Sequence, residues 1–177
     1  MSRLRAAGAY EGVLRDAIHA LKYDGRRSLA APLGVLMRDA AGDLLDGASA
    51  VVPVPLHGAR RRQRGFNQAR LLARGLGLPV WPLLRRVRNT TPQAGLTRAR
   101  RHGNVRHAFA VARRFVWQAY AIRHWTEAPA ATGRILVLVD DVTTTGATLE
   151  ACARVLRDAG AREVRALTVA RAVSRTR

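Results

Sequence analysis

The segment that most constrains the fold is residues 135–148, which read ILVLVDDVTTTGAT. Residues 135–139 form a continuous apolar run, and a buried strand is therefore predicted from Arg134 to Val139. A helix is predicted from Leu149 to Ala159, because Leu149, Cys152, Ala153 and Leu156 fall on one face. A second apolar strand is predicted from Val164 to Ala170. Strand, helix and strand in so short a stretch predict a crossover between parallel strands, with ligands at the carboxyl edge of the sheet.

Length and composition limit the rest of the architecture. The chain has 177 residues, of which 48% are hydrophobic, so we expect a single domain over residues 1–177 with one core. We expect helices within residues 10–45 and a ligand-binding core over residues 50–177. The predicted fold is α/β, a three-layer sandwich around a mainly parallel sheet.

No apolar run is long enough to cross a membrane, and Met1 to Tyr10 lack the apolar core of a secretory signal. We therefore expect a cytoplasmic protein without membrane insertion. Cys152 is the only cysteine, which excludes an internal disulfide or a cysteine zinc cluster.

Periodicity and turn residues predict the elements upstream. The first helix runs from Tyr10 to Tyr23, with an apolar stripe of Val13, Leu14, Ala17, Ile18 and Leu21. The others are a helix over about Leu29 to Leu45, a strand over Ala50 to Val54, a helix over about Phe66 to Leu76 and a short strand near Trp81 to Leu84. A basic loop follows. The aromatic residues of 115–131 are expected to pack on the domain or on a neighbouring subunit, which leaves a homodimer open.

The charge is strongly one-sided. The net charge is +19, and residues Gly47 to Thr126 hold sixteen arginines but no Asp or Glu. Such a block repels itself unless anions occupy it, which favours phosphate-bearing partners. A general preference for arginine is the alternative, because Lys22 is the only lysine among 31 basic residues.

The end of the strand predicts a binding site. Asp140 and Asp141 arrive at the sheet edge, and a turn rich in threonine and glycine leads into a helix. Backbone N–H groups of such a turn, beside the positive end of a helix dipole, favour a phosphate. Gly146 permits close approach of the backbone, and Thr148 is a candidate helix cap. Two acids beside a phosphate suit a ligand with ribose hydroxyls and a divalent cation.

Two other interpretations of the acidic pair are open: it ends a strand by chance, or it belongs to another kind of phosphate site. A P-loop is excluded, because no GxxxxGK[ST] string is present. A receiver-type phosphoacceptor site remains an alternative, although it requires no TTTGAT turn after its acids.

The string VLVDDVTTTGAT resembles the phosphoribosyl pyrophosphate (PRPP) signature of type I phosphoribosyltransferases, with Thr143 where an aliphatic residue is more usual. The resemblance implies that Asp140 and Asp141 contact the ribose 2- and 3-hydroxyls, and hold Mg²⁺ indirectly through PRPP. It also implies a 5-phosphate site made of Thr144, Thr145, Gly146, Ala147 and Thr148.

Other segments are similar to the ComF-like (competence protein F) branch. They are YEGVLRDAIHALKYDGR from Tyr10, VVPVPLH from Val51, RRRQRGFNQARLLARGL from Arg60 and TTPQAGLTRARRHGNVRHAF from Thr90. The similarity implies a pyrophosphate-binding group of Pro55, Leu56, His57, Arg60 and Arg61. It also implies a mobile basic flap with Gln93, Arg100, Arg101 and Asn104. Many members begin with a four-cysteine zinc ribbon, which this chain lacks, and residues 115–132 look longer than is usual in the family.

The resemblance implies transfer of a phosphoribosyl group, with release of pyrophosphate, to an unidentified base, amine or ammonia. His57 and His102 are candidates for proton transfer or for simple donation to phosphate. Two alternatives remain: a PRPP or nucleotide sensor without catalysis, and a competence-related accessory protein that binds single-stranded DNA during DNA uptake.

Overall fold

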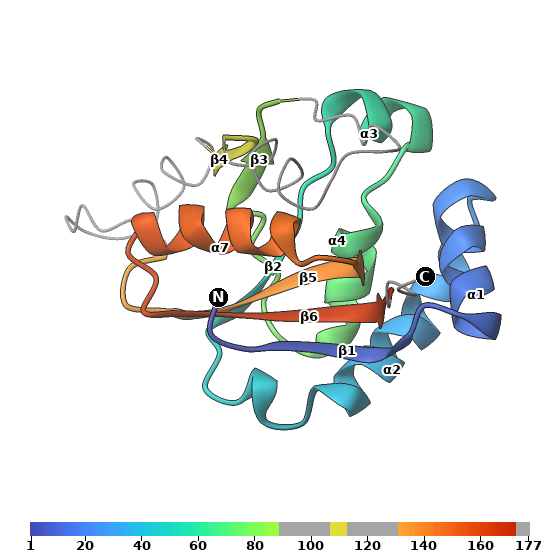
Figure 1. The fold of residues 1–177 in the computed structure, drawn as a ribbon, viewed down its shortest axis with the longest axis horizontal. Coiled ribbons are helices and arrows are strands. Elements are labelled where there is room, and N and C mark those ends of the chain that lie inside the picture. The colour runs from blue at the N-terminus through green and yellow to red at the C-terminus, as the bar shows by residue number, and fades with distance from the viewer. Residues whose placement is uncertain (89–106, 113–130, 173–177) are drawn as a thin grey trace, which may run out of the picture.

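The computed structural model describes residues 1–88, 107–112 and 131–172 (Figure 1). Its centre is a parallel sheet of four strands in the order β1-β6-β5-β2. The strands are β1 (Leu4–Ala9), β2 (Ala50–Pro53), β5 (Ile135–Thr143) and β6 (Glu163–Arg171). The predicted parallel crossover from β5 to β6 is confirmed.

Helices cover both faces of this sheet, which confirms the three-layer sandwich (Figure 1). On one face, Leu136 and Leu138 of β5 pack with α7 (Ala147–Asp158). On the other, Val137 and Val139 pack with α2 (Ala30–Ala41) and α4 (Gln68–Ala73). Alternate residues of a strand point to opposite faces, so a wholly apolar run is what a strand covered on both sides requires.

The remaining elements lie around this core. They are α1 (Gly12–Tyr23), α3 (Gly58–Arg64), the 3₁₀ turns η1 (Arg27–Leu29), η2 (Gly42–Leu45) and η3 (Arg74–Leu76), and an antiparallel pair of β3 (Leu84–Arg86) and β4 (Phe109–Val111). The helix predicted over 29–45 is thus an α-helix between two 3₁₀ turns, and the helix predicted over 66–76 is an α-helix followed by one 3₁₀ turn.

The structure differs from the sequence-based expectations in three further respects. Strand β1 was not expected, because LRAAGA has weak strand propensity; pairing with β6 along its length overrides it. Helix α3 was not expected, because its arginine-rich sequence shows no apolar stripe. Val13 does not belong to the apolar stripe of α1: it is 86% exposed, since it lies about 100° around the helix from Leu14.

Parallel strands bring three connections to one edge. Strand β1 leads into α1, β2 leads to α3 and β5 leads to α7, all from carboxyl ends. Figure 1 shows α1 beside the arrowheads of β5 and β6, with α3 above it. This edge is where ligands of open parallel sheets bind.

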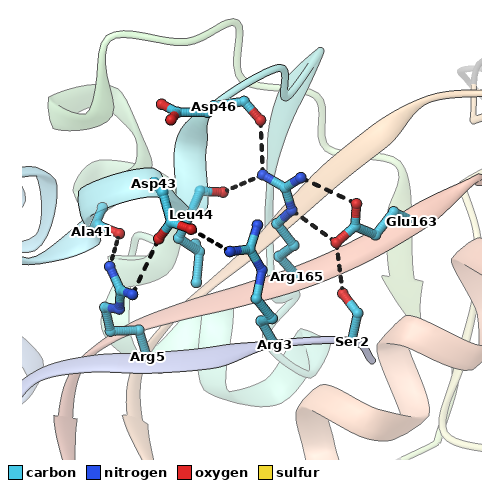
Figure 2. A network of polar contacts seen from close by, with 9 residues as sticks. All are labelled: Ser2, Arg3, Arg5, Ala41, Asp43, Leu44, Asp46, Glu163 and Arg165. Carbon is cyan, nitrogen blue, oxygen red and sulfur yellow. Dashed lines mark hydrogen bonds and ion pairs between the residues drawn. The ribbon is translucent and has the colours of Figure 1, made fainter.

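The opposite edge carries a polar network (Figure 2). The guanidinium of Arg165 donates to the carbonyl oxygens of Leu44 and Asp46 and to both carboxylate oxygens of Glu163, at 2.8–3.1 Å. Glu163 also accepts from the Ser2 hydroxyl. The network joins β6 to η2 and to the start of the chain, and it lies away from the candidate site.

Within the three described ranges, no helix has the length and apolar character that a bilayer crossing needs. The flap residues Gln93, Arg100, Arg101 and Asn104, together with His102 and most of 115–132, lie outside the described residues.

Candidate functional site

The two carboxylates lie where β5 passes the end of β2. The last pair between these strands is Pro53 with Val139, so Asp140 and Asp141 extend beyond β2 while Asp140 still pairs with Thr168 of β6. Strand alternation sends their side chains to opposite faces: Asp140 toward the face of α7 and Asp141 toward that of α1. A ligand can therefore meet both only from the end of the strand.

Asp141 forms an ion pair with Lys22 of α1. Lys22 Nζ lies 2.9 Å from Asp141 Oδ1, and the two side chains are 15% and 6% exposed. Asp141 Oδ1 also accepts from the Val142 N–H at 2.6 Å. Asp141 Oδ2 is buried and has no hydrogen-bond partner within the described part of the chain. A buried carboxylate oxygen without a donor is costly, so this atom is well suited to a ligand hydroxyl or a cation.

Asp140 has an altered acidity. Burial, and next the negative charge of Asp141, raise its pKa to about 8. The Asp141 N–H, which donates to Asp140 Oδ1 at 2.9 Å, and the positive charges of Lys22 and Arg86 act in the opposite direction. Carboxylates shifted in this way by burial and by a like charge are frequent at functional sites.

Arg86 supplies positive charge on the Asp140 side. It lies in β3, and its guanidinium carbon is 5.4 Å from the centroid of the Phe109 ring. Burial lowers its pKa, and the charge of Arg60 lowers it further, while the charge of Asp140 raises it. The site thus places a cation near each carboxylate, Lys22 at Asp141 and Arg86 at Asp140.

The turn after the acids leads directly into α7. Gly146 is the residue that caps the helix, with φ of 77°, a conformation that glycine adopts without a side-chain clash. The Thr145 hydroxyl accepts from the Ala147 N–H at 3.4 Å. The expectation that Thr148 caps the helix is wrong, because α7 already begins at Ala147 and Thr148 lies in its first turn.

The loop after β2 approaches the same edge. The Val54 N–H donates to the Val139 carbonyl at 2.9 Å, and Asn67 Nδ2 donates to the Val54 carbonyl at 3.0 Å. These bonds hold the start of the Pro55, Leu56 and His57 loop beside Asp140. His57 caps α3, with its Nδ1 accepting from the Ala59 N–H at 3.3 Å.

The two predicted arginines of this group differ in position. Arg60 is partly buried, and its charge influences Arg86. Arg61 is exposed on α3. The structure therefore places Arg60, but not Arg61, near Arg86 and in the lining of a cavity that Lys22 shares.

Beside Asp141 lies a cavity of about 630 Å³. Its lining comes from the end of α1 and the turn after it, from α3 and from the segment between α3 and α4. It includes Lys22, Tyr23, Arg60, Gln63, Arg64 and Phe66. Because Lys22 both lines this cavity and pairs with Asp141, the cavity adjoins the candidate site.

Lys22 and Arg86 were missed as site residues at the level of sequence. Lys22 did carry a signal, because it is the only lysine in a chain with thirty arginines. Arg86 carried no such signal, since it lies in an arginine-rich stretch and only the β3 pairing turns it toward Asp140.

The chain is similar in sequence to a known protein family and to several known proteins. The family model "Phosphoribosyl transferase domain" matches residues 62–177. The chain is 36% identical over 152 residues to "Competence protein F" of Haemophilus influenzae, covering 82% of this chain and 61% of that one. It is 33% identical over 175 residues to "DNA utilization protein YhgH" of Salmonella typhimurium, covering 92% and 69%.

"Competence protein ComFC" of Bacillus subtilis is 32% identical over 110 residues, which cover 62% of this chain and 39% of that one. The chain thus spans about three fifths of the length of the Haemophilus protein and about two thirds of that of the Salmonella protein. The chain belongs to the ComF-like family within the type I phosphoribosyltransferase superfamily.

Proposed function

We propose that this protein binds PRPP and transfers its phosphoribosyl group to an acceptor nitrogen, with release of pyrophosphate. The observation that carries the proposal is the position of Asp140 and Asp141, between the Gly146 turn of α7 and the loop of Pro55 to His57. This arrangement offers N–H donors for a phosphate on one side and carboxylates for ribose hydroxyls in the middle.

Each group of site residues binds one part of PRPP. Thr144, Thr145, Gly146, Ala147 and Thr148 hold the 5-phosphate in this proposal. Asp140 and Asp141 accept hydrogen bonds from the ribose hydroxyls. The pyrophosphate lies at Pro55, Leu56 and His57, with Arg60 and Arg61 near its charge. Gln93, Arg100, Arg101 and Asn104 close over it.

The reaction breaks one bond and forms one. The bond from ribose C1 to the pyrophosphate oxygen breaks, and its electron pair leaves with pyrophosphate. The acceptor nitrogen donates its lone pair to C1 and loses its proton to water or a neighbouring base. Charge that builds on the leaving oxygen is stabilised by arginines already in place, as Arg60 is.

Magnesium fits this site only together with the ligand. Among the residues described, no group of three or more His, Cys, Asp or Glu side chains could hold a metal alone. Asp141 Oδ2, which is buried and has no donor among the described residues, and the nearby Asp140 carboxyl group suit a cation that PRPP oxygens also bind. When bound, Mg²⁺ would neutralise the pyrophosphate. The protein residues orient the sugar.

The experiment has two readouts, PRPP binding with Mg²⁺ by calorimetry and pyrophosphate release across a panel of bases, amines and ammonia. We expect wild type to bind PRPP and to release pyrophosphate with one acceptor class. Asp141→Asn should lower kcat/KM about 10- to 100-fold, because it replaces a charged hydrogen bond to ribose. Asp158→Asn, at the exposed far end of α7, is the matched control and should behave as wild type.

The outcomes separate the alternatives. PRPP binding without pyrophosphate release for any acceptor would identify a sensor. Absence of PRPP binding would refute the proposal.

The names of the relatives and the basic surface support a second candidate, a role in handling single-stranded DNA during uptake or use of DNA. Binding driven by phosphate contacts loses affinity linearly on a plot of log K against log salt concentration. We expect such a slope for an oligothymidylate, and we expect Asp141→Asn to leave the affinity unchanged. A salt-independent affinity would exclude this electrostatic mode.

A further inference from the structure

The cavity between α1 and α3 is a cationic site that the PRPP contacts above do not account for. Lys22 and Arg64 on its wall have no part in the proposed phosphate contacts, and Asp24 is its one acidic lining residue. Within the described ranges, no acid forms an ion pair with Arg60 or Arg64. An anion bound in the cavity would pair with these cationic groups.

The cationic groups are held in place before any ligand arrives. Arg64 Nη1 donates to the buried Gln68 Oε1 at 2.9 Å, and the Arg64 guanidinium carbon lies 5.1 Å from the centroid of the Tyr23 ring. Arg27 is placed in the same way over Phe66, at 4.8 Å. A guanidinium ordered by such contacts loses less conformational entropy when it binds a carboxylate.

The size and shape of the cavity further limit the class of ligand that it can bind. About 630 Å³ is in the range of sites for small organic molecules and larger than one phosphate requires. On the cavity wall, the rings of Tyr23 and Phe66 and the guanidinium of Arg64 are flat, and flat groups favour a planar ligand. A planar ring with a carboxylate satisfies both the charge and the shape.

Lys22 connects this cavity to the ribose site, because it pairs with Asp141 at 2.9 Å. A ring in the cavity would therefore lie next to the carboxylate that we assign to the ribose. That is the position an acceptor requires.

We propose that this cavity binds the acceptor, and that the acceptor is a planar nitrogen heterocycle carrying a carboxylate. This inference rests on the proposed function. The carboxylate pairs with Arg64, and the ring nitrogen faces the sugar. That nitrogen forms the bond to C1 as the bond from C1 to oxygen breaks, and pyrophosphate leaves with the electron pair. Any proton on the nitrogen passes to water.

The test compares matched ring compounds that differ only in charge. The probes are pyridine-3-carboxylate against pyridine-3-carboxamide, and uracil-6-carboxylate against uracil, titrated into the full chain by calorimetry without PRPP. We expect at least one carboxylate to bind about tenfold or more tightly than its neutral partner, as loss of a charged pair predicts.

Variants locate the binding. Arg64→Gln should weaken binding of the carboxylate about tenfold and leave binding of the neutral compound unchanged. Arg64→Met, which keeps an apolar side chain over Tyr23, is the second variant should Arg64→Gln unfold. Arg62→Gln is the control, because Arg62 is exposed on the same helix and does not line the cavity. Equal binding of acid and amide, or carboxylate binding that both cavity variants leave intact, would overturn the inference.

Two further arms separate this inference from the proposed function. PRPP binding is measured on wild type and on Arg64→Gln. Its absence in both proteins refutes the proposed function, whereas the carboxylate titrations still decide whether the cavity binds a ring carboxylate. If an oligothymidylate binds in a manner that requires Arg64 while the ring carboxylates do not bind, the cavity is part of a nucleic-acid surface and the inference is wrong.

Discussion

At the scale of single residues, the pair of Lys22 and Asp141 determines the electrostatics of the site. Both side chains are largely buried, so the carboxylate loses most of its hydration and depends on the ammonium group for compensation. Removing the cation would leave the buried charge of Asp141 without a partner.

We predict that Lys22→Met lowers the free energy of unfolding by about 3 kcal/mol, the usual cost of breaking one side of a buried ion pair. The double variant K22M/D141N should recover part of this loss, because no buried charge remains. Arg15→Met is the control on the same helix; its pair with Asp16 is exposed, so its effect should stay under about 1 kcal/mol. Urea unfolding followed by circular dichroism measures all four proteins, and a double variant no more stable than K22M would contradict the explanation.

The sequence was sufficient to identify the carboxylates and the Gly146 turn, because both belong to one short segment whose strand and helix are predicted by local pattern. It could not identify their partners. Lys22 and Arg86 reach the acids only through the packing of α1 and the pairing of β3, which are tertiary contacts between distant parts of the chain. Thr148 illustrates a local error: a side chain able to cap was displaced from that role by the earlier helix start at Gly146.

At the scale of elements, α2 and η3 touch through two glycines. A Cβ on Gly75 would lie 2.8 Å from Gly34 Cα and 3.0 Å from the Gly34 carbonyl carbon. A Cβ on Gly34 would lie 3.1 Å from Gly75 Cα. Because the obstacles are backbone atoms, a methyl group at either position must separate the two elements.

We predict that Gly75→Ala lowers the free energy of unfolding by about 2 kcal/mol, the typical cost of overpacking, although alanine has the better helix propensity. The control is Gly58→Ala in α3, whose Cβ would meet only the Arg62 side chain at an ordinary 3.5 Å. That protein should be as stable as wild type or more so. Chemical denaturation gives both values, and equal stability of the two variants would argue against the close approach.

Elements with an apolar period were predictable, whereas those held by tertiary contacts were not. The strands β5 and β6 are buried on both sides, so their continuous apolar runs appear in the sequence. Strand β1, made of Leu, Arg, Ala and Gly, is formed by its ladder with β6. Helix α3 ends at Gly65, whose left-handed conformation stops it, but its arginines carry no periodic signal.

At the scale of the whole molecule, the charge is divided between the two edges of the sheet. The carboxyl edge combines Asp140 and Asp141 with Lys22, Arg60, Arg64 and Arg86, an excess of positive charge suited to anionic ligands. At the amino edge, acids and bases are paired. Arg3 and Arg5 of the first strand region contact Asp43, and Glu163 contacts Arg165 (Figure 2).

The ion pairs at the amino edge of the sheet predict that stability depends on pH. Hydrogen bonds from Arg165 and then from Ser2 lower the pKa of Glu163 from 4.5 to about 2. A carboxyl group with a lowered pKa in the folded state contributes stability that is complete above the unfolded value. That contribution is lost as the pH falls from 4.5 through about 2.

We predict that Glu163→Gln lowers the free energy of unfolding by about 1 kcal/mol at pH 7, a modest value because the Glu163 side chain is 29% exposed and solvent weakens the pair. The difference from wild type should stay constant down to about pH 5 and become smaller toward pH 3, as wild-type Glu163 takes up a proton. Glu11→Gln, at an exposed side chain with no ion pair among the described residues, is the control and should show no difference across this range. Urea midpoints at each pH provide the measurement. Glu163 contacts Ser2 at the start of the chain and Arg165, which in turn contacts η2. A difference that persisted unchanged to pH 3 would therefore mean that packing and backbone contacts join these segments and that the charge of Glu163 does not contribute.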